Sequence, residues 1–556
     1  MSNWYPYNPL NTNQQNNNPY PNAPQLGSQQ YNYFPNMQQF RNQQDYRYYP
    51  NIPHYQALRQ PERTDFSRFR PINPSTQDEL ILPRGYKYDI VATWGEDLGN
   101  GEKFGYNNDF TCYFGSNPNE GLLWVNHEYI GHMTLFVTGY KEEPGGPKRS
   151  AQQIATEKYN LGGSVIHIRK GQDGNWSIVK GSKYNRRITA NTPINLTGPA
   201  RGDAAVGGAT QVIGTFANCS GGKTLWNTAF SGEENYEGIV EDWSETPGVQ
   251  PLNATHYGWV VEIEPYDPNS TPKKHSMLGR FAHENAVMTL GRSGRVVVYS
   301  GDDANDQCVY KFVSDGVYDS KKGKENSRLL EKGTLYVANM GDNKWVPLDL
   351  EKSTKLKEKY KTQGEVLVNT RDAAKLVGGT PLDRPEDVEI HPRDGSVYIA
   401  FTNNTKHGNY YGQIYRLVED SNDHESTTFV YEIFVAGGPQ SGFACPDNLM
   451  FDQSGNLWVC TDISSDKTNE GAYRPFGNNG LYMIPTEGHN RGKAMRFASA
   501  PVQAELTGTW LAPDGETLFM SVQHPGEESK DVNNPTSRWP FGDIPRPSVV
   551  AISRVK

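Results

Sequence analysis

Acidic side chains beside turn-forming residues recur in six short segments of this 556-residue chain. Hard cations such as Ca²⁺ take six to eight oxygen ligands from carboxylates, carbonyls and amides, and several of these segments place an asparagine next to the carboxylate. A single acidic residue at a strand end is usually a solvated turn or cap, but six such clusters together favour a shared cation site. The segments are Asn126–Tyr129, Gly232–Asn235, Ala282–Asn285, Gly301–Asp303, Arg384–Asp387 and Pro446–Asn448.

The histidines in two of these segments, His127 and His283, have two interpretations. Each could be a metal ligand, and each could be bonded within its own turn, which is the commoner arrangement. No HExxH, GxSxG or phosphate-binding loop pattern occurs, which excludes the commonest zinc protease, serine hydrolase and nucleotide-binding sites. Five widely spaced cysteines contain no CxxC pair, so buried free thiols are their ordinary interpretation.

Short strands joined by tight turns must position these segments. Leu382–Asn404 is a hairpin pattern, because Asp394-Gly395 lies between two stretches of alternating apolar residues. Two further hairpins are predicted, one that pairs Ser164–Arg169 with Ser177–Lys180 and one that pairs Arg295–Ser300 with Cys308–Val313. A strand is predicted at Thr224–Phe230 after a Gly-Gly turn, and a surface helix over Asp349–Lys361.

The unit of apolar run, turn and apolar run returns irregularly over nearly 480 residues. Together with 55 Gly, 37 Pro and 32 Tyr, this recurring pattern of strands and turns favours an all-β fold with many turns. The length favours a β-propeller with long inserted loops, although no WD signature is present. We expect six blades and a catalytic domain over residues 71–556. A propeller gathers distant strand ends around one central channel, so the six acidic segments could form one site.

Residues 1–70 have a different composition, dominated by Asn, Gln, Tyr and Pro. The first acidic residue is Asp45 and the first lysine is Lys87. Such a segment buries too little aliphatic surface to order itself, so a disordered tail is predicted. Polar and aromatic tracts of this kind can self-associate or adhere to surfaces.

The net charge of −9 offers no basic face for nucleic acid, so no nucleic-acid partner is expected. No apolar run approaches the roughly 18–20 residues that span a bilayer, and no transmembrane segment is expected. No secretory signal is recognised either. We expect a monomer, and the sequence leaves the location open.

Many of these segments together resemble the PhoX family of bacterial alkaline phosphatases. The resemblance runs in order from about residue 80 to about residue 550 and does not cover the Asn/Gln-rich tail. The segments that carry it are Phe104–Phe110, Asn126–Tyr129, Ala217–Trp226, Gly232–Asn235, Gly279–Glu284, Gly301–Asp303, Tyr310–Val313 and Arg384–Asp387.

The resemblance implies a β-propeller hydrolase of phosphomonoesters whose site holds iron (Fe³⁺) together with calcium (Ca²⁺). It implies that Cys219 ligates iron, since thiolate suits iron and carboxylates suit both metals. It also implies two groups that bind phosphate, with Arg384 as the clamp and Lys223 as a weaker candidate. The implied carboxylate ligands are Glu234, Glu284 and Glu386, followed by Glu128, Asp302 and Asp447.

The expected mechanism is direct in-line displacement at phosphorus, with an attacking oxygen whose pKa the cations lower. Two departures from the family pattern stand out. Exported members carry a twin-arginine signal, and none is recognised here. Where the family often has Cys-Glu-Glu-Asn, this chain has Gly232 before Glu233, so a second thiol is absent from that segment.

Two alternatives remain open. The Pro446–Leu449 segment with Asp452 and Asn456–Trp458 is similar to the blade pattern of calcium-dependent, lactonase-like propellers. A non-enzymatic, surface-associated propeller that keeps only structural calcium is the other. Activity on a phosphomonoester and on a lactone, with calcium, would separate the phosphatase from the lactonase.

Overall fold

The computed structural model describes residues 66–143, 146 and 148–555. The predicted tail therefore lies almost entirely outside the described residues. Phe66, the first described residue, is buried against Trp458 and Phe497.

Strands dominate the described part of the chain, and the prediction of an all-β fold is confirmed. They form six sheets of four or more strands and one two-stranded ribbon within that part. In order of pairing, the first sheet contains β2 (Asn108–Asn117), β3 (Glu120–His127), β4 (Gly162–Lys170) and β5 (Trp176–Ile178), and β6 (Arg186–Ile188) also pairs with β4. The second contains β9 (Asn218–Lys223), β10 (Ala229–Glu233), β11 (Val260–Ile263), β12 (Lys273–His275), β7 (Pro193–Thr197) and β8 (Gln211–Ile213). The third contains β13 (Val287–Leu290), β14 (Arg295–Gly301), β16 (Val309–Val317), β17 (Gly333–Asn339) and β18 (Lys344–Pro347).

The remaining sheets are more regular, with four antiparallel strands each. The fourth sheet contains β20 (Pro385–Ile390), β21 (Val397–Phe401), β22 (Gln413–Glu419) and β23 (Phe429–Ala436). The fifth contains β24 (Pro446–Phe451), β25 (Leu457–Thr461), β26 (Gly480–Ile484) and β27 (Met495–Ser499). The sixth contains β28 (Glu505–Leu511), β29 (Thr517–Gln523), β30 (Ser548–Arg554) and β1 (Tyr86–Thr93). The ribbon pairs β15 (Asn305–Gln307) with β19 (Leu382–Asp383).

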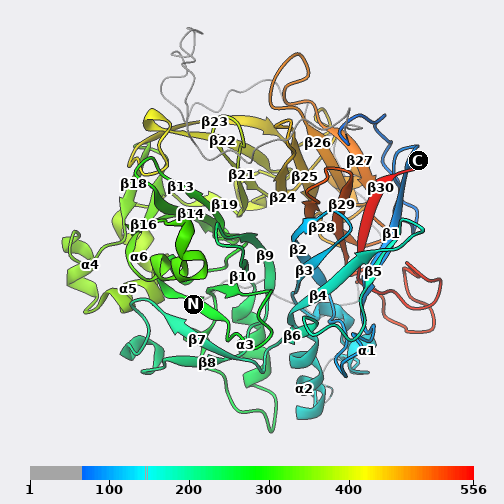
Figure 1. Ribbon diagram of the computed structural model, residues 1–556, viewed down its shortest axis with the longest axis horizontal. Helices are drawn as coiled ribbons and strands as arrows, with labels where there is room; N and C mark the ends of the chain where they lie inside the picture. Colours follow the sequence, from blue (N-terminus) through cyan, green and yellow to red (C-terminus); the bar gives the residue numbers. More distant parts are fainter. Residues whose placement is uncertain (1–65, 144–145, 147, 556) are drawn as a thin grey trace, which may run out of the picture. The chain divides into compact units, whose positions relative to one another are not determined.

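Two features join these sheets to one another. The first strand, β1, pairs antiparallel with the last, β30, so both ends of the described chain contribute to one sheet (Figure 1). The first strand of each sheet contacts that of the next, in the closed order β2, β9, β13, β20, β24, β28 and back to β2. We call these six the inner strands.

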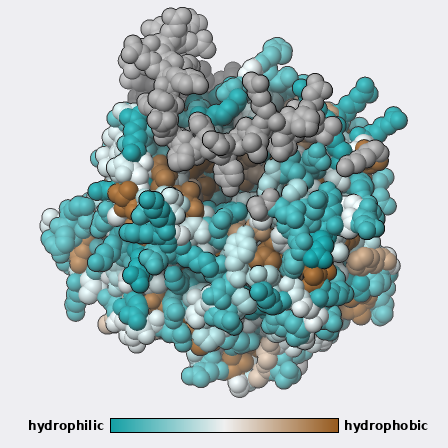
Figure 2. All heavy atoms as spheres, viewed as in Figure 1, coloured by the Kyte–Doolittle hydropathy of each residue, from teal (hydrophilic) through white to brown (hydrophobic). Residues whose placement is uncertain are grey.

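The helices lie in the connections between strands, and among the described residues none is long and apolar enough to cross a membrane. They are α1 (Thr134–Val137), α2 (Ala151–Asn160), α3 (Tyr236–Ser244), α4 (Thr354–Lys359), α5 (Gln363–Val368) and α6 (Thr370–Val377). Apolar side chains are buried mainly between neighbouring sheets, as Val297, Val397 and Ile399 are. Hydrophilic side chains cover most of the face seen in Figure 2, with apolar ones scattered among them.

The predicted hairpins are confirmed. Asp394-Gly395 turns the chain between β20 and β21, β4 pairs with β5, and β14 pairs with β16. The helix expected over residues 349–361 is shorter, and one of its residues, Leu356, is buried in the core instead of lying on the surface.

The prediction of a strand at Thr224–Phe230 after a Gly-Gly turn is wrong. Gly221 and Gly222 lie inside β9, and the turn follows them. A Cβ on Gly221 would stand 2.1 Å from the carbonyl oxygen of Phe230, and one on Gly222 would stand 2.2 Å from that of Ala286. These glycines therefore permit close approach of β9 to its two neighbours, which is a second use of glycine in strands.

Candidate functional site

The inner strands share an irregularity where candidate ligands stand. Pairing with the neighbouring strand skips Asp109 and the next residue in β2, Glu386 and the next in β20, and Asp447 and the next in β24. Such bulges re-aim side chains. The residue two positions before each of these ligands, and before Cys219, has a positive φ: Asn107 (53°), Arg384 (55°), Cys445 (53°) and Ala217 (56°).

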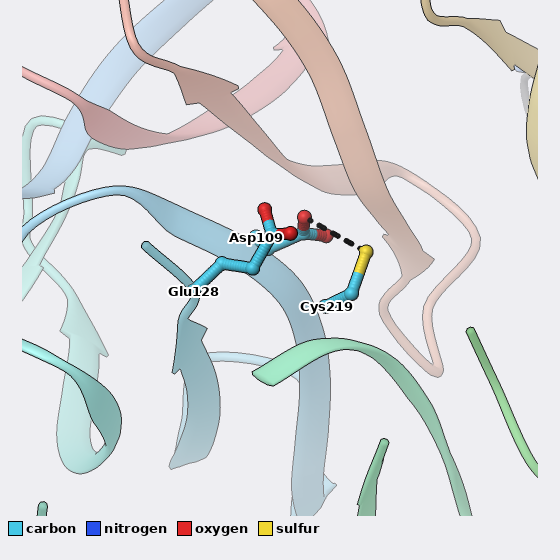
Figure 3. Close-up of side chains that lie close together, drawn as sticks. All are labelled: Asp109, Glu128 and Cys219. Atoms are coloured by element: carbon cyan, nitrogen blue, oxygen red, sulfur yellow. Dashed lines mark hydrogen bonds between the residues drawn. The ribbon is translucent and has the colours of Figure 1, made fainter. Parts of the chain in front are cut away.

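This shared backbone conformation helps bring buried side chains from different sheets together. Three overlapping groups of potential metal ligands result, and in each group the ligand atoms lie within 4.8 Å of one another. The first group, Asp109, Glu128 and Cys219, comes from β2, the end of β3 and β9, and its side chains point toward one another (Figure 3). The other groups are Cys219, Glu234 and Glu284, and then Glu284, Glu386 and Asp447.

Hydrogen bonds hold the first of these groups in place. Thr507 Oγ1 donates to Asp109 Oδ1 at 2.6 Å, and Gln523 Nε2 donates to Glu128 Oε2 at 2.6 Å. The Cys219 thiol lies 3.5 Å from Asp109 Oδ2. Both supporting side chains come from the sheet that β30 completes, so that sheet orients ligands carried by another sheet.

The remaining carboxylates are oriented in the same way. Asn235 donates to Glu234 Oε2 at 2.7 Å and Thr402 donates to Glu386 Oε1 at 2.7 Å. Asn448 donates to Glu284 Oε1 at 3.0 Å, whereas the buried Glu284 Oε2 has no hydrogen-bond partner among the described residues. An oxygen left unpaired in this position is available to a cation.

The electrostatics of the groups point the same way. Burial, followed by repulsion from neighbouring carboxylates, raises the pKa values of Asp109, Glu234 and Glu284 well above the ordinary range. Burial raises the pKa of Asp447 to about 7. Since desolvated like charges destabilise each other, cations between these side chains would stabilise them. Carboxylates with one thiol fit hard cations together with a transition metal.

Arg384 is the residue directly before β20, and its side chain lies at the edge of the three ligand groups. Its Nη2 atom is 2.6 Å from Asp303 Oδ2 and 2.9 Å from Glu386 Oε1. The side chain is 20% exposed, so the guanidinium is held by carboxylates on one side and remains partly accessible. This geometry suits a donor to a substrate oxyanion.

Two of the sequence-predicted residues lie outside the groups. Asp302 is buried and receives hydrogen bonds from Arg371 Nε, at 3.1 and 2.9 Å, and from Arg371 Nη2, at 2.6 Å. Lys223 lies at the far end of β9 from Cys219, where its Nζ donates to the Tyr113 carbonyl at 3.0 Å. The structure thus brings together six of the seven predicted metal ligands, with Cys219 shared by two groups, and places Lys223 elsewhere.

The two histidines are also outside the three groups. His127 Nε2 is 2.7 Å from Ser164 Oγ, and His283 contacts Ser300 Oγ and the Gly279 carbonyl, each at 2.9 Å. Their pKa values are lowered by burial, that of His283 to about 3, so both are neutral and structural.

Asp109 is the candidate that sequence reasoning missed. It lies within Phe104–Phe110, a segment noted only for its resemblance to a family. The available signal was the pair of asparagines before it, because asparagine tolerates the positive φ that Asn107 adopts.

The fold and the site define an all-β protein with a buried centre suited to several cations. A scan against protein families matches residues 67–526 to "Alkaline phosphatase PhoX". The chain therefore belongs to the PhoX alkaline phosphatase family, and it is a metal-dependent phosphatase.

Solved structures agree with this assignment. Pseudomonas fluorescens PhoX in complex with vanadate, a transition state analogue, is 33% identical, with a TM-score of 0.77 over 87% of this chain and 98% of that one. A gluconolactonase from Xanthomonas campestris is 8% identical with a TM-score of 0.35, over 88% of this chain and 99% of that one, which is too low to support an argument. A search of curated proteins gives no significant match.

Proposed function

We propose that this chain hydrolyses phosphomonoesters at the three overlapping ligand groups, with Fe³⁺ and Ca²⁺ as cofactors. The observation that carries the proposal is the position of Arg384, which is partly exposed and lies within hydrogen-bond distance of Glu386, a member of the third group. A cation cluster beside a guanidinium is a site for a phosphoryl group, whose charge both can neutralise. The relative solved with vanadate supports the same chemistry.

The ligand atoms of the groups differ, and this difference assigns a metal to each group. Cys219 belongs to the first two groups, and its thiolate, with Asp109, Glu128 and Glu234, suits iron. Glu284, Glu386 and Asp447 form a group of oxygen donors alone, which suits calcium. When bound, the cations supply charge neutralisation for the phosphoryl group and lower the pKa of the attacking oxygen.

The chain's own side chains orient the substrate. Asp303 and Glu386 both contact Nη2 of Arg384, which leaves Nε and Nη1 to bind phosphate oxygens. A preorganised donor of this kind contributes because it need not reorient as charge develops in the transition state. Lys223 has no part in this proposal, because its Nζ contacts Tyr113.

The architecture proposed for this function is a six-bladed propeller over residues 71–556, with one blade for each of the six larger sheets among the described residues. The closed order of inner-strand contacts supports this count. We further propose that the protein is a monomer and that the residue 1–70 segment acts in surface or self-association. Small-angle scattering of the full chain and of a chain beginning at Asp65 tests both statements.

The experiment that tests the metal centre compares two buried cysteines. Cys219→Ala should remove iron and phosphatase activity together, whereas Cys308→Ala, in a core cluster away from the groups, should keep both. Iron and calcium are counted per chain, and hydrolysis is measured on a phosphomonoester and on a lactone. Iron and activity retained in Cys219→Ala would exclude the thiolate ligand, and turnover of the lactone alone would favour the lactonase alternative.

A further inference from the structure

A pair of acidic side chains outside the three ligand groups lies on the inner strand β20. A cavity of about 200 Å³ is lined by residues of all six inner strands. We call it the inner-strand cavity, and residues that line it include Phe110, Lys223, Met288, Asp387, Met450 and Trp510. These positions follow the ligand-bearing ones along the same strands, so the cavity adjoins the proposed active site, and Asn448, which donates to Glu284, also lines it.

Two carboxylates line this cavity from one strand. Asp387 and Glu389 are two residues apart in β20, so their side chains share a face of the strand. Asp387 is only 4% exposed. Its Oδ2 accepts a hydrogen bond from the Leu449 amide at 2.9 Å, but its buried Oδ1 has no hydrogen-bond partner among the described residues.

In the part of the chain that the structure describes, these carboxylates have no ion-pair partner. Within the described residues, no lysine, arginine or histidine forms an ion pair with Asp387 or Glu389. Lys223 also lines the cavity, but its Nζ donates to the Tyr113 carbonyl and lies 4.7 Å from the centre of the Phe114 ring. A buried, unpaired carboxylate oxygen is costly unless a partner neutralises it.

We propose that Asp387 and Glu389 bind a divalent cation of the oxygen-preferring class, such as Ca²⁺, in the inner-strand cavity. Two carboxylates match that class, and no histidine or cysteine lines the cavity among the described residues. The cavity has room for coordinated waters, each of which occupies about 30 Å³ in the liquid. Through the Leu449 amide, the same site ties β20 to β24, and the cation stabilises the contact between these inner strands.

The test compares two double variants of the metal-loaded protein. Asp387→Asn with Glu389→Gln removes both carboxylates. Asp420→Asn with Glu432→Gln removes the same charge from β23 and from the turn before it. After dialysis into Ca²⁺, the first variant should hold one calcium fewer per chain than the wild type at equal iron content, and the control should hold as many as the wild type. Equal calcium in all three proteins would overturn the proposal.

A second measurement avoids any dependence on the folding of the double variant. Tb³⁺ replaces Ca²⁺ at oxygen sites and emits when a nearby tryptophan transfers energy to it, and Trp510 lines the cavity. Trp510→Phe should lower tryptophan-sensitised Tb³⁺ emission at least twofold with unchanged Tb³⁺ stoichiometry, and excess Ca²⁺ should abolish the lost component in the wild type. Emission that is identical in the wild type and Trp510→Phe would show that no cation lies there.

Discussion

Replacing Arg384 with alanine tests the proposed phosphate clamp directly. The guanidinium has five N–H donors, and the two carboxylate contacts both use Nη2. The remaining donors can form two charge-assisted hydrogen bonds to a phosphoryl group, each worth about 1.5–3 kcal/mol. Because removal of one such donor typically slows catalysis by about 10²–10³-fold, we expect kcat/KM of Arg384→Ala to fall by about that factor.

The assay is hydrolysis of a chromogenic phosphomonoester, with iron and calcium counted in the same preparations. Arg384→Ala should retain its metals, since Arg384 contacts carboxylates rather than supplying a ligand atom. Arg384→Lys should be intermediate, because it keeps the charge but loses the planar fork. Arg416→Ala should match the wild type, because Arg416 lies on β22 and contacts Asp394 at the opposite end of the same sheet. Loss of metal in Arg384→Ala would make Arg384 structural and refute the clamp.

Three other perturbations have defined outcomes. Chelation should lower Tm because the buried carboxylates then repel one another, and re-added cations should restore it. A ligand at 1,000 times its Kd stabilises the folded state by about 4 kcal/mol. An unchanged Tm would contradict the proposal that the ligand groups bind cations. Gly222→Ala should lower the free energy of unfolding by about 1–3 kcal/mol in urea titrations, because its Cβ would clash with Ala286, whereas Gly341→Ala, with space around it, should not. His424 is buried beside Tyr299, and burial lowers its pKa to about 4. The free energy of unfolding is therefore unaffected by His424 above the unfolded pKa near 6.5, and it decreases by up to about 3 kcal/mol as pH falls toward 4. His424→Gln should make the free energy of unfolding less dependent on pH over that range.

Local turn chemistry made the hairpins predictable. Asp394-Gly395 requires a left-handed residue, and Gly395 adopts φ of 71°. Gly221 and Gly222 misled the same reasoning, because a glycine needed for close strand approach has no sequence mark that separates it from a turn glycine. Strand boundaries around β9 were therefore displaced.

The acidic residues of the site could be listed from the sequence, but their partners could not. Asp302 and Asp303 are neighbours, yet the first pairs with Arg371 from an inserted helix and the second with Arg384. Lys223 follows Cys219 by four residues, and the strand carries it to the inner-strand cavity. Which of several acidic neighbours reaches the centre depends on bulges and on insertions, and neither has a strong local signal.

The pairing of β1 with β30 has a consequence for the order of events after synthesis. Thr507 and Gln523, which orient Asp109 and Glu128, belong to the sheet that is complete only when β30 is in place. A nascent chain holds the ligands of the first group long before it holds the residues that orient them. Stable loading of the first metal is therefore expected only after residues 548–554 have left the ribosome and paired, which couples metal insertion to the last described strand.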